Sequence, residues 1–296
     1  MTESSHLVSR LPGLSKSIHS SSLPIARSKY PVTRFPHYAI RAAALLLACA
    51  TASASCKAAI GELTARASDE WTRTYPLGAE GEVQVVNANG IVDVEGVEGS
   101  MVEVRAQRIA RGATEAVARE LLPRIGIKED VGAGRISIET ERIAGLLIGA
   151  SFTVDYRVRA PVSARIRAKT VNGPISVRAI AGRVVLNTTN GAIVGRELSG
   201  GVEARTVNGR VEITLRSVGN DLVDLRTVNG AIDLAVPRAS KANLSASVVN
   251  GPIETTGMTL ELLGEQTRRR VRGRLNGGGT PVELATVNGR IQIAGQ

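Results

Sequence analysis

Histidine, cysteine and aromatic residues are scarce in this sequence. Of its 296 residues, three are histidine, two are cysteine and 2% are aromatic. Two cysteines are too few for a disulfide-dense scaffold or for a cysteine-rich zinc or iron–sulfur site. No aromatic residues are interleaved with the basic ones to stack on bases, so we expect no nucleic-acid partner. No phosphate-binding or dinucleotide-binding motif precedes a predicted helix.

Residues 1–54 have the features of a secretory signal peptide with an extended basic region. They contain six basic residues and one acidic residue, and the apolar residues 42–54 end in the small-residue pattern Ala52-Ser53-Ala54. This order of a basic region, a short apolar region and a small-residue site is typical of export signals. The apolar stretch is shorter than the roughly 20 residues that span a bilayer. We expect export to the periplasm, the outer membrane or the cell surface; an organellar transit peptide is the alternative.

Removal of this leader would change the chemistry open to the protein. All three histidines, His6, His19 and His37, lie in it, as does half of the net charge of +10. Nucleophilic catalysis of the Ser-His-Asp or Cys-His kind requires a histidine base. Histidine-ligated zinc would be excluded as well. We therefore expect neither an enzyme nor a bound cofactor or metal.

Both cysteines stand where a lipoprotein signal could use them. Cys49 follows Leu46-Leu47-Ala48, which is similar to a lipobox, and Cys56 follows the small residues Ser53-Ala54-Ser55. A lipid anchor on Cys49 or Cys56 would attach the protein to a membrane through several acyl chains. The alternative is ordinary cleavage, which leaves Cys56 unpaired in residues 55–80, a predicted tether or first strand.

The rest of the chain is an internal repeat built around Asn-Gly. Successive Asn-Gly pairs in its central part are 18, 18, 21 and 21 residues apart, and five copies read TVNG or VVNG. Apolar and polar residues alternate on both sides of each pair, which is the pattern of strands with one buried face. Each repeat is therefore predicted to be two short strands joined at an Asn-Gly corner. The corner asparagines are Asn172, Asn190, Asn208, Asn229, Asn250 and Asn288.

Two all-β architectures fit this repeat. In a single-stranded parallel β-solenoid, each repeat is one coil and equivalent side chains stack, so that the asparagines form a ladder. In an antiparallel β-sandwich or meander, Asn-Gly is a hairpin turn. The identical residues in register favour the solenoid, over residues 81–296, with an insertion at 257–280. A short helix is predicted at residues 113–122 in the N-terminal part.

The segment Val154-Asp155-Tyr156-Arg157-Val158, then Ala160-Pro161 and the repeated TVNG, resembles the DUF4097-type adhesin family over roughly residues 80–296. The resemblance implies a β-solenoid exported to the bacterial envelope or surface, without an established catalytic role. It therefore supplies no catalytic residues. The chain departs from the family pattern at residues 257–280 and in its long leader.

Two groups of charged residues are candidate ligand-binding sites. Glu212, Asp233 and Glu254 each lie four residues after a corner asparagine, so coils stacked in chain order would place their carboxylates about 5 Å apart. Such carboxylates could serve glycoside hydrolysis or bind a cation, or they could be a solvated face neutralised by Arg210 and Arg290.

The densest basic run is Arg268, Arg269 and Arg270, followed by Arg272 and Arg274. It could contact phosphate-bearing lipids or polysaccharide, or be a solvated loop. The sequence as a whole predicts an exported, non-enzymatic, adhesin-like scaffold or binding module of the cell envelope. Its expected partner is an envelope protein, a polysaccharide or an anionic surface. A polysaccharide-active β-helix enzyme and an envelope-stress or signalling accessory protein are the alternatives.

Overall fold

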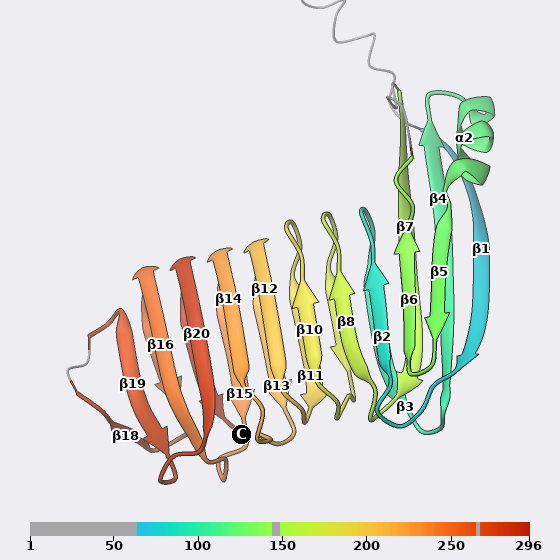
Figure 1. The fold of residues 1–296 in the computed structure, drawn as a ribbon. Helices are drawn as coiled ribbons and strands as arrows, with labels where there is room; N and C mark the ends of the chain where they lie inside the picture. The colour runs from blue at the N-terminus through green and yellow to red at the C-terminus, as the bar shows by residue number, and fades with distance from the viewer. Residues whose placement is uncertain (1–63, 144–148, 265–266) are drawn as a thin grey trace, which may run out of the picture. The chain divides into compact units, whose positions relative to one another are not determined.

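A computed structural model describes residues 64–143, 149–264 and 267–296 (Figure 1). The predicted signal peptide and the candidate lipidation sites Cys49 and Cys56 lie outside these residues. The described residues are all-β apart from one short α-helix and one turn of 3₁₀-helix, as the sequence predicted. None of these helices has the length and apolar character needed to cross a membrane.

The strands form two large sheets. In spatial order, the first sheet contains β1 (Ala65–Pro76), β4 (Met101–Gly112), β7 (Ala150–Pro161), β3 (Val92–Val97), β9 (Ile175–Arg178), β11 (Ile193–Leu198), β13 (Val211–Leu215), β15 (Ile232–Val236), β21 (Ile291–Gly295) and β17 (Ile253–Thr256). The second sheet contains β18 (Leu260–Leu262), β19 (Arg270–Leu275), β16 (Ala242–Asn250), β20 (Thr280–Asn288), β14 (Val223–Asn229), β12 (Val202–Asn208), β10 (Val184–Asn187), β8 (Arg165–Lys169), β2 (Glu82–Val86), β6 (Arg135–Thr140) and β5 (Ile127–Gly132).

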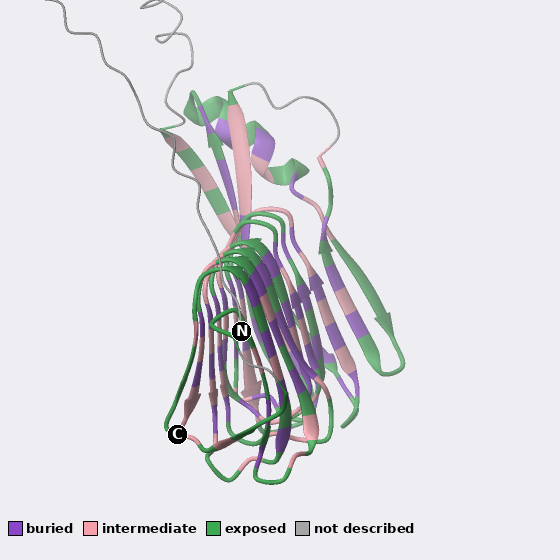
Figure 2. Ribbon diagram, turned by 90° about the vertical axis from the view of Figure 1, so that its left-hand side faces the viewer, coloured by how far each residue is buried: buried purple, intermediate pink, exposed green. Residues whose placement is uncertain are grey.

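Each repeat contributes one strand to each sheet, and the repeat strands pair in parallel with like residues in register. Val202 of β12 pairs with Val223 of β14, and Val211 of β13 pairs with Ile232 of β15. Because side chains alternate along a strand, these apolar positions all point between the sheets, where they are fully buried (Figure 2). The core therefore consists mainly of stacked valine, isoleucine and leucine side chains, with few aromatic ones.

Antiparallel strands lie at both ends of the second sheet and at one end of the first, so both sheets are mixed. At one end β1, β4 and β7 pair antiparallel, and β5 pairs antiparallel with β6. Trp71 and Tyr75 lie on β1, where both side chains pack against the core. At the other end β19 pairs antiparallel with β16 and with β18. The insertion predicted at residues 257–280 thus contains the hairpin that covers the edge of the second sheet.

The helix α2 (Glu115–Leu121) lies at the N-terminal end, within the predicted range, and η1 (Leu122–Arg124) follows it. The hydroxyl oxygen of Thr114 caps α2 by accepting the backbone N–H of Val117. Pro123, the second residue of η1, lacks the N–H that would continue the α-helix. Leu121 buries the inner face of the helix against the core.

The strand order in space departs from the chain order at the C-terminal end. Strand β20, the last strand of the second sheet in the chain, lies between β14 and β16, and β21 lies between β15 and β17. Asn288 of β20 is therefore in register with both Asn229 and Asn250. The expectation that repeats stack in chain order is wrong here, because β18 and β19 lead the chain outward and the final repeat then returns into the stack.

Candidate binding surfaces

The Asn-Gly corners form a continuous ladder of side-chain amides. In spatial order the ladder runs through Asn89, Asn172, Asn190, Asn208, Asn229, Asn288 and Asn250. Each amide nitrogen donates to the carboxamide oxygen of the preceding asparagine over 2.8–2.9 Å. All six bonds point the same way, so their dipoles reinforce one another. The corner is thereby held as one regular row.

Threonine and valine before the asparagine have opposite roles. Thr206 and Thr227 are buried, and their hydroxyls donate to the carbonyl oxygens of Gly191 and Gly209 in the neighbouring repeat. This bond satisfies a backbone carbonyl at the corner, which explains why threonine recurs. The valines point outward instead, with 39–55% of their surface exposed; they are Val171, Val207, Val228, Val249 and Val287. This exposed row was not predicted from the sequence, although the alternation of apolar and polar positions could have indicated it.

The expected row of three carboxylates is not formed. Glu212 and Asp233 are neighbours in register, but the next residue after Asp233 is Gln292 of the intercalated strand, and Glu254 lies beyond it. The prediction of the row was therefore wrong for Glu254. It failed because the row follows spatial order and not chain order.

Arginines neutralise the two carboxylates that remain neighbours. Arg196 and Arg210 lie 3.4 and 3.1 Å from the carboxylate oxygens of Glu212. Arg290 lies 3.2 Å from Asp233. Among the described residues, no three His, Cys, Asp or Glu side chains group together as metal ligands would. This face is thus a ladder of ion pairs.

A second ion-pair ladder crosses the outer face of the second sheet. Asp224, with 3% of its side chain exposed, lies between Arg205 and Arg226, each 2.6 Å away. Hydrogen bonding to the Asp224 carboxylate raises the pKa of the Arg226 guanidinium. Arg226 also reaches Glu283 of β20 over 3.2 Å. These bonds tie three strands together across their outer face.

Tyr156 of β7 makes its hydrogen bond within the interior of the protein. Tyr156 is fully buried, and its hydroxyl lies 2.7 Å from that of Thr140, which donates to the side-chain oxygen of Asn87. Burial raises the pKa of the Tyr156 phenol to about 12. The group is therefore neutral and hydrogen-bonded, as a structural residue of the core.

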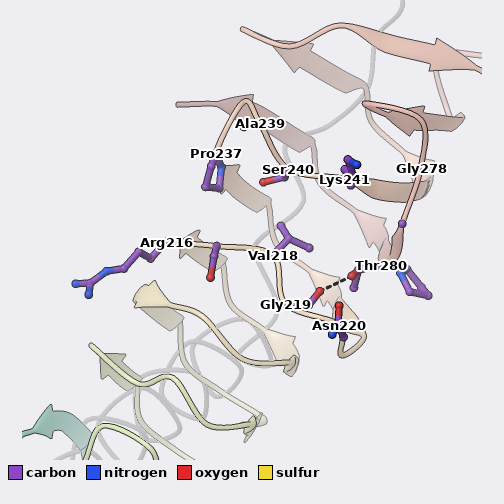
Figure 3. A pocket seen from close by; sticks show the side chains of 13 residues that line it. Arg216, Val218, Gly219, Asn220, Pro237, Ala239, Ser240, Lys241, Gly278 and Thr280 are labelled. Carbon is purple, nitrogen blue, oxygen red and sulfur yellow. Dashed lines mark hydrogen bonds between the residues drawn. The ribbon is translucent and has the colours of Figure 1, made fainter.

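The crossover of the last repeat leaves a hollow of about 710 Å³. Three connecting segments surround it: residues 216–220 before β14, 237–241 before β16, and 278–281 at the start of β20 (Figure 3). The hydroxyl of Thr280 donates to the carbonyl oxygen of Gly219 and holds two of these segments together (Figure 3). The hollow exists because the connection to β16 must pass over the intercalated strands, so it could not be found from repeat spacing.

The lining of this crossover hollow is basic and polar. Arg216 and Lys241 contribute to it, and none of its lining residues is acidic. The Arg216 guanidinium is paired with Glu197 over 2.5 Å, so Lys241 is the lining cation that makes no ion pair among the described residues. The hydroxyls of Ser217 and Ser240 and the amide of Asn220 add hydrogen-bonding groups. Such a set can bind a carboxylate or phosphate group but offers no nucleophile paired with a base.

The basic run lies at the end of the second sheet. Arg268 and Arg269 lie in the turn before β19, and Arg270 is the first residue of that strand. Arg272 and Arg274 follow on the same strand. Most of the run is thus part of a strand and not of a loop.

No protein-family model and no curated protein matches the sequence. Among solved structures, the chain is similar to a "putative cell adhesion protein" from Clostridium sporogenes, with 11% identity, a TM-score of 0.41, and coverage of 78% of this chain and 100% of that one. It is similar to a "putative adhesin" from Bacteroides fragilis, with 12% identity, a TM-score of 0.36, and coverage of 77% and 97%. A third, a "putative adhesin" from Parabacteroides distasonis, has 12% identity, a TM-score of 0.25, and coverage of 76% and 97%.

Proposed function

We propose that the protein is an exported, non-enzymatic component of the cell envelope or surface, and that its repeat region is an adhesin-like scaffold and binding module. The observation that supports this most is the arrangement of its polar groups. Amides bond to amides and arginines to carboxylates in long rows above an apolar core. Rows of this kind make a regular surface that suits an extended partner.

The same proposal treats the repeat strands as a parallel solenoid with antiparallel ends. Pairs such as β10 with β12 and β11 with β13 are parallel and in register. The antiparallel strands end the parallel stack at the N-terminal end of both sheets and at the C-terminal end of the second sheet.

The residues from 64 onward also support a binding role over catalysis. They contain no histidine and no cysteine. The crossover hollow, with Lys241 and the hydroxyls of Ser217 and Ser240, is suited to an anionic group of a polysaccharide or an envelope protein. Glu212 and Asp233, the carboxylates that glycoside hydrolysis would require, are each held by arginine.

The test of export is cell fractionation with mass spectrometry of the mature N-terminus. We expect the protein in the envelope fraction, beginning at Ser55 or carrying acyl chains on Cys49 or Cys56. Replacing Ala54→Arg should block cleavage and leave the leader attached, because the site requires small residues. The matched control is Ser53→Ala. It changes the position between Ala52 and Ala54, where the cleavage site does not require a small residue, and should leave processing unchanged. A cytoplasmic chain that still begins at Met1 in the unmodified protein would contradict the proposal.

A further inference from the structure

The hairpin of β18 and β19 is the outermost part of the second sheet. Strand β20 follows the hairpin in the chain but lies between β14 and β16, so it does not cover the hairpin. The hairpin therefore forms the end of the second sheet opposite β5 (Figure 1). Leu275 of β19 points into the core, whereas Arg270, Arg272 and Arg274 are exposed on the outer face. Alternate residues of a strand are about 7 Å apart, so the three arginines form a row.

The neighbours on β16 do not compensate the charge of Arg270 and Arg274. On β16 the residues in register with the arginines are Ser247, Ser245 and Asn243, which carry no charge. Arg270 and Arg274 make no ion pair within the described part of the chain. Glu261 on β18 lies in register with Arg274.

Further basic and hydroxyl groups extend the row at its start. Arg269 and Arg270 line a hollow of about 550 Å³ together with Ser247 and Thr267. The turn that precedes β19 is fixed, since Thr267 and Arg270 exchange backbone hydrogen bonds of 3.0 and 3.2 Å. Guanidinium and hydroxyl groups held together in this way match the oxygens of a phosphate group.

Exposed aliphatic side chains lie at the outer edge of the hairpin. Leu262, on the edge strand, is 58% exposed, the largest value among the exposed large hydrophobic residues of the described chain. Leu263 follows it and is also exposed. Leu262 is in register with Gly273, so its side chain points to the opposite face of the hairpin from the arginines. Because β18 is the outermost strand, the two faces meet at its edge, and arginine stems that reach past this edge can bind the same membrane interface as the leucines. A polysaccharide would match the arginines but would leave these leucines unexplained.

We propose that the β18–β19 hairpin binds the surface of a membrane that contains anionic phospholipid. Phosphate groups contact Arg269, Arg270 and Arg274, and Leu262 enters the interfacial region of the bilayer. This inference rests on the proposed function and specifies its partner as the surface of an anionic membrane. Binding of purified protein to vesicles does not depend on export, so this proposal and the export proposal fail separately.

The test is sedimentation with vesicles of equal parts phosphatidylglycerol and phosphatidylcholine, against phosphatidylcholine alone. A Cys49→Ser/Cys56→Ser background prevents acylation. Each basic residue near an anionic membrane contributes about 1 kcal/mol, or about fivefold. Arg270→Gln/Arg274→Gln should therefore weaken binding about 30-fold, and Leu262→Ser at least about threefold. The control Arg66→Gln/Arg111→Gln removes the same charge from exposed positions on β1 and β4 and should leave binding within about twofold.

Melting curves of all variants show whether each remains folded. Binding that survives Arg270→Gln/Arg274→Gln, or that the control lowers equally, would overturn the proposal. Arginine-dependent binding of soluble polygalacturonate together with no effect of Leu262→Ser on vesicle binding would identify a polysaccharide site and would also overturn it.

Discussion

Replacing Ile232→Asp is expected to abolish folding of the repeat region. Ile232 is fully buried and is stacked between Val211 and Ile291 in the first sheet. An aspartate there would lose the packing of the isoleucine, worth about 2–5 kcal/mol, and would bury a charge without a partner. Together these costs are comparable with the whole stability of a typical domain, about 5–15 kcal/mol.

The matched control is Ala235→Asp on the same strand. Ala235 is three residues further along β15 and points to the opposite, outer face, where it is partly exposed. We expect this variant to keep the circular-dichroism spectrum of the unmodified protein and a melting transition close to it. If Ile232→Asp melted at the same temperature as Ala235→Asp, the inward assignment of the repeat positions would be refuted.

Replacing Gly209→Ala is expected to destabilise the stack by about 3 kcal/mol or more. A Cβ atom at Gly209 would lie 1.9 Å from the backbone carbonyl oxygen of Gly191 in the neighbouring repeat. Two backbones that approach this closely leave no room for a side chain, and neither can move without breaking the ladder of Asn190 and Asn208. The close approach of adjacent corners thus explains why glycine follows asparagine in every repeat.

Urea unfolding measures this effect against Gly132→Ala at the end of β5. A Cβ atom at Gly132 would meet nothing within 4 Å. This control should change the free energy of unfolding by less than about 1 kcal/mol. Equal destabilisation by the two substitutions would show that crowding at the corner is not the cause.

The local structure of the repeats could be predicted because its signals are local. Alternation of apolar and polar residues places Val223 and Leu225 inward, and both are buried. The short helix was predicted from its helix-forming residues and apolar stripe, and it occurs within the predicted range. It was harder to predict which residues of TVNG point inward, because threonine and valine are both β-branched. The threonine is buried and its hydroxyl donates to a backbone carbonyl, as Thr206 does to Gly191, which valine cannot do.

The order of the repeats could not be predicted because each corner is compatible with every other. Asn229 is followed in the chain by Asn250, yet its neighbour in space is Asn288, which carries the same corner residues. The local pattern therefore does not show which corner lies next to Asn229. The crossover hollow and the separation of Glu254 from Asp233 both follow from this order. The arginines of β19 were recognised as a group, but their place on an outermost hairpin depends on the same long-range arrangement.

The position of the final strand pair is the central structural claim, since the hollow and the exposed hairpin both depend on it. It can be tested with disulfides in a Cys49→Ser/Cys56→Ser background. Adjacent strands are about 4.8 Å apart, within the range of a disulfide, whereas strands separated by another are about 10 Å apart and beyond it. Asp233→Cys/Gln292→Cys should therefore form the intramolecular disulfide under mild oxidation, and Asp233→Cys/Glu254→Cys should not. Formation of the second disulfide and not the first, established by mass spectrometry of the linked peptides, would contradict the intercalated order.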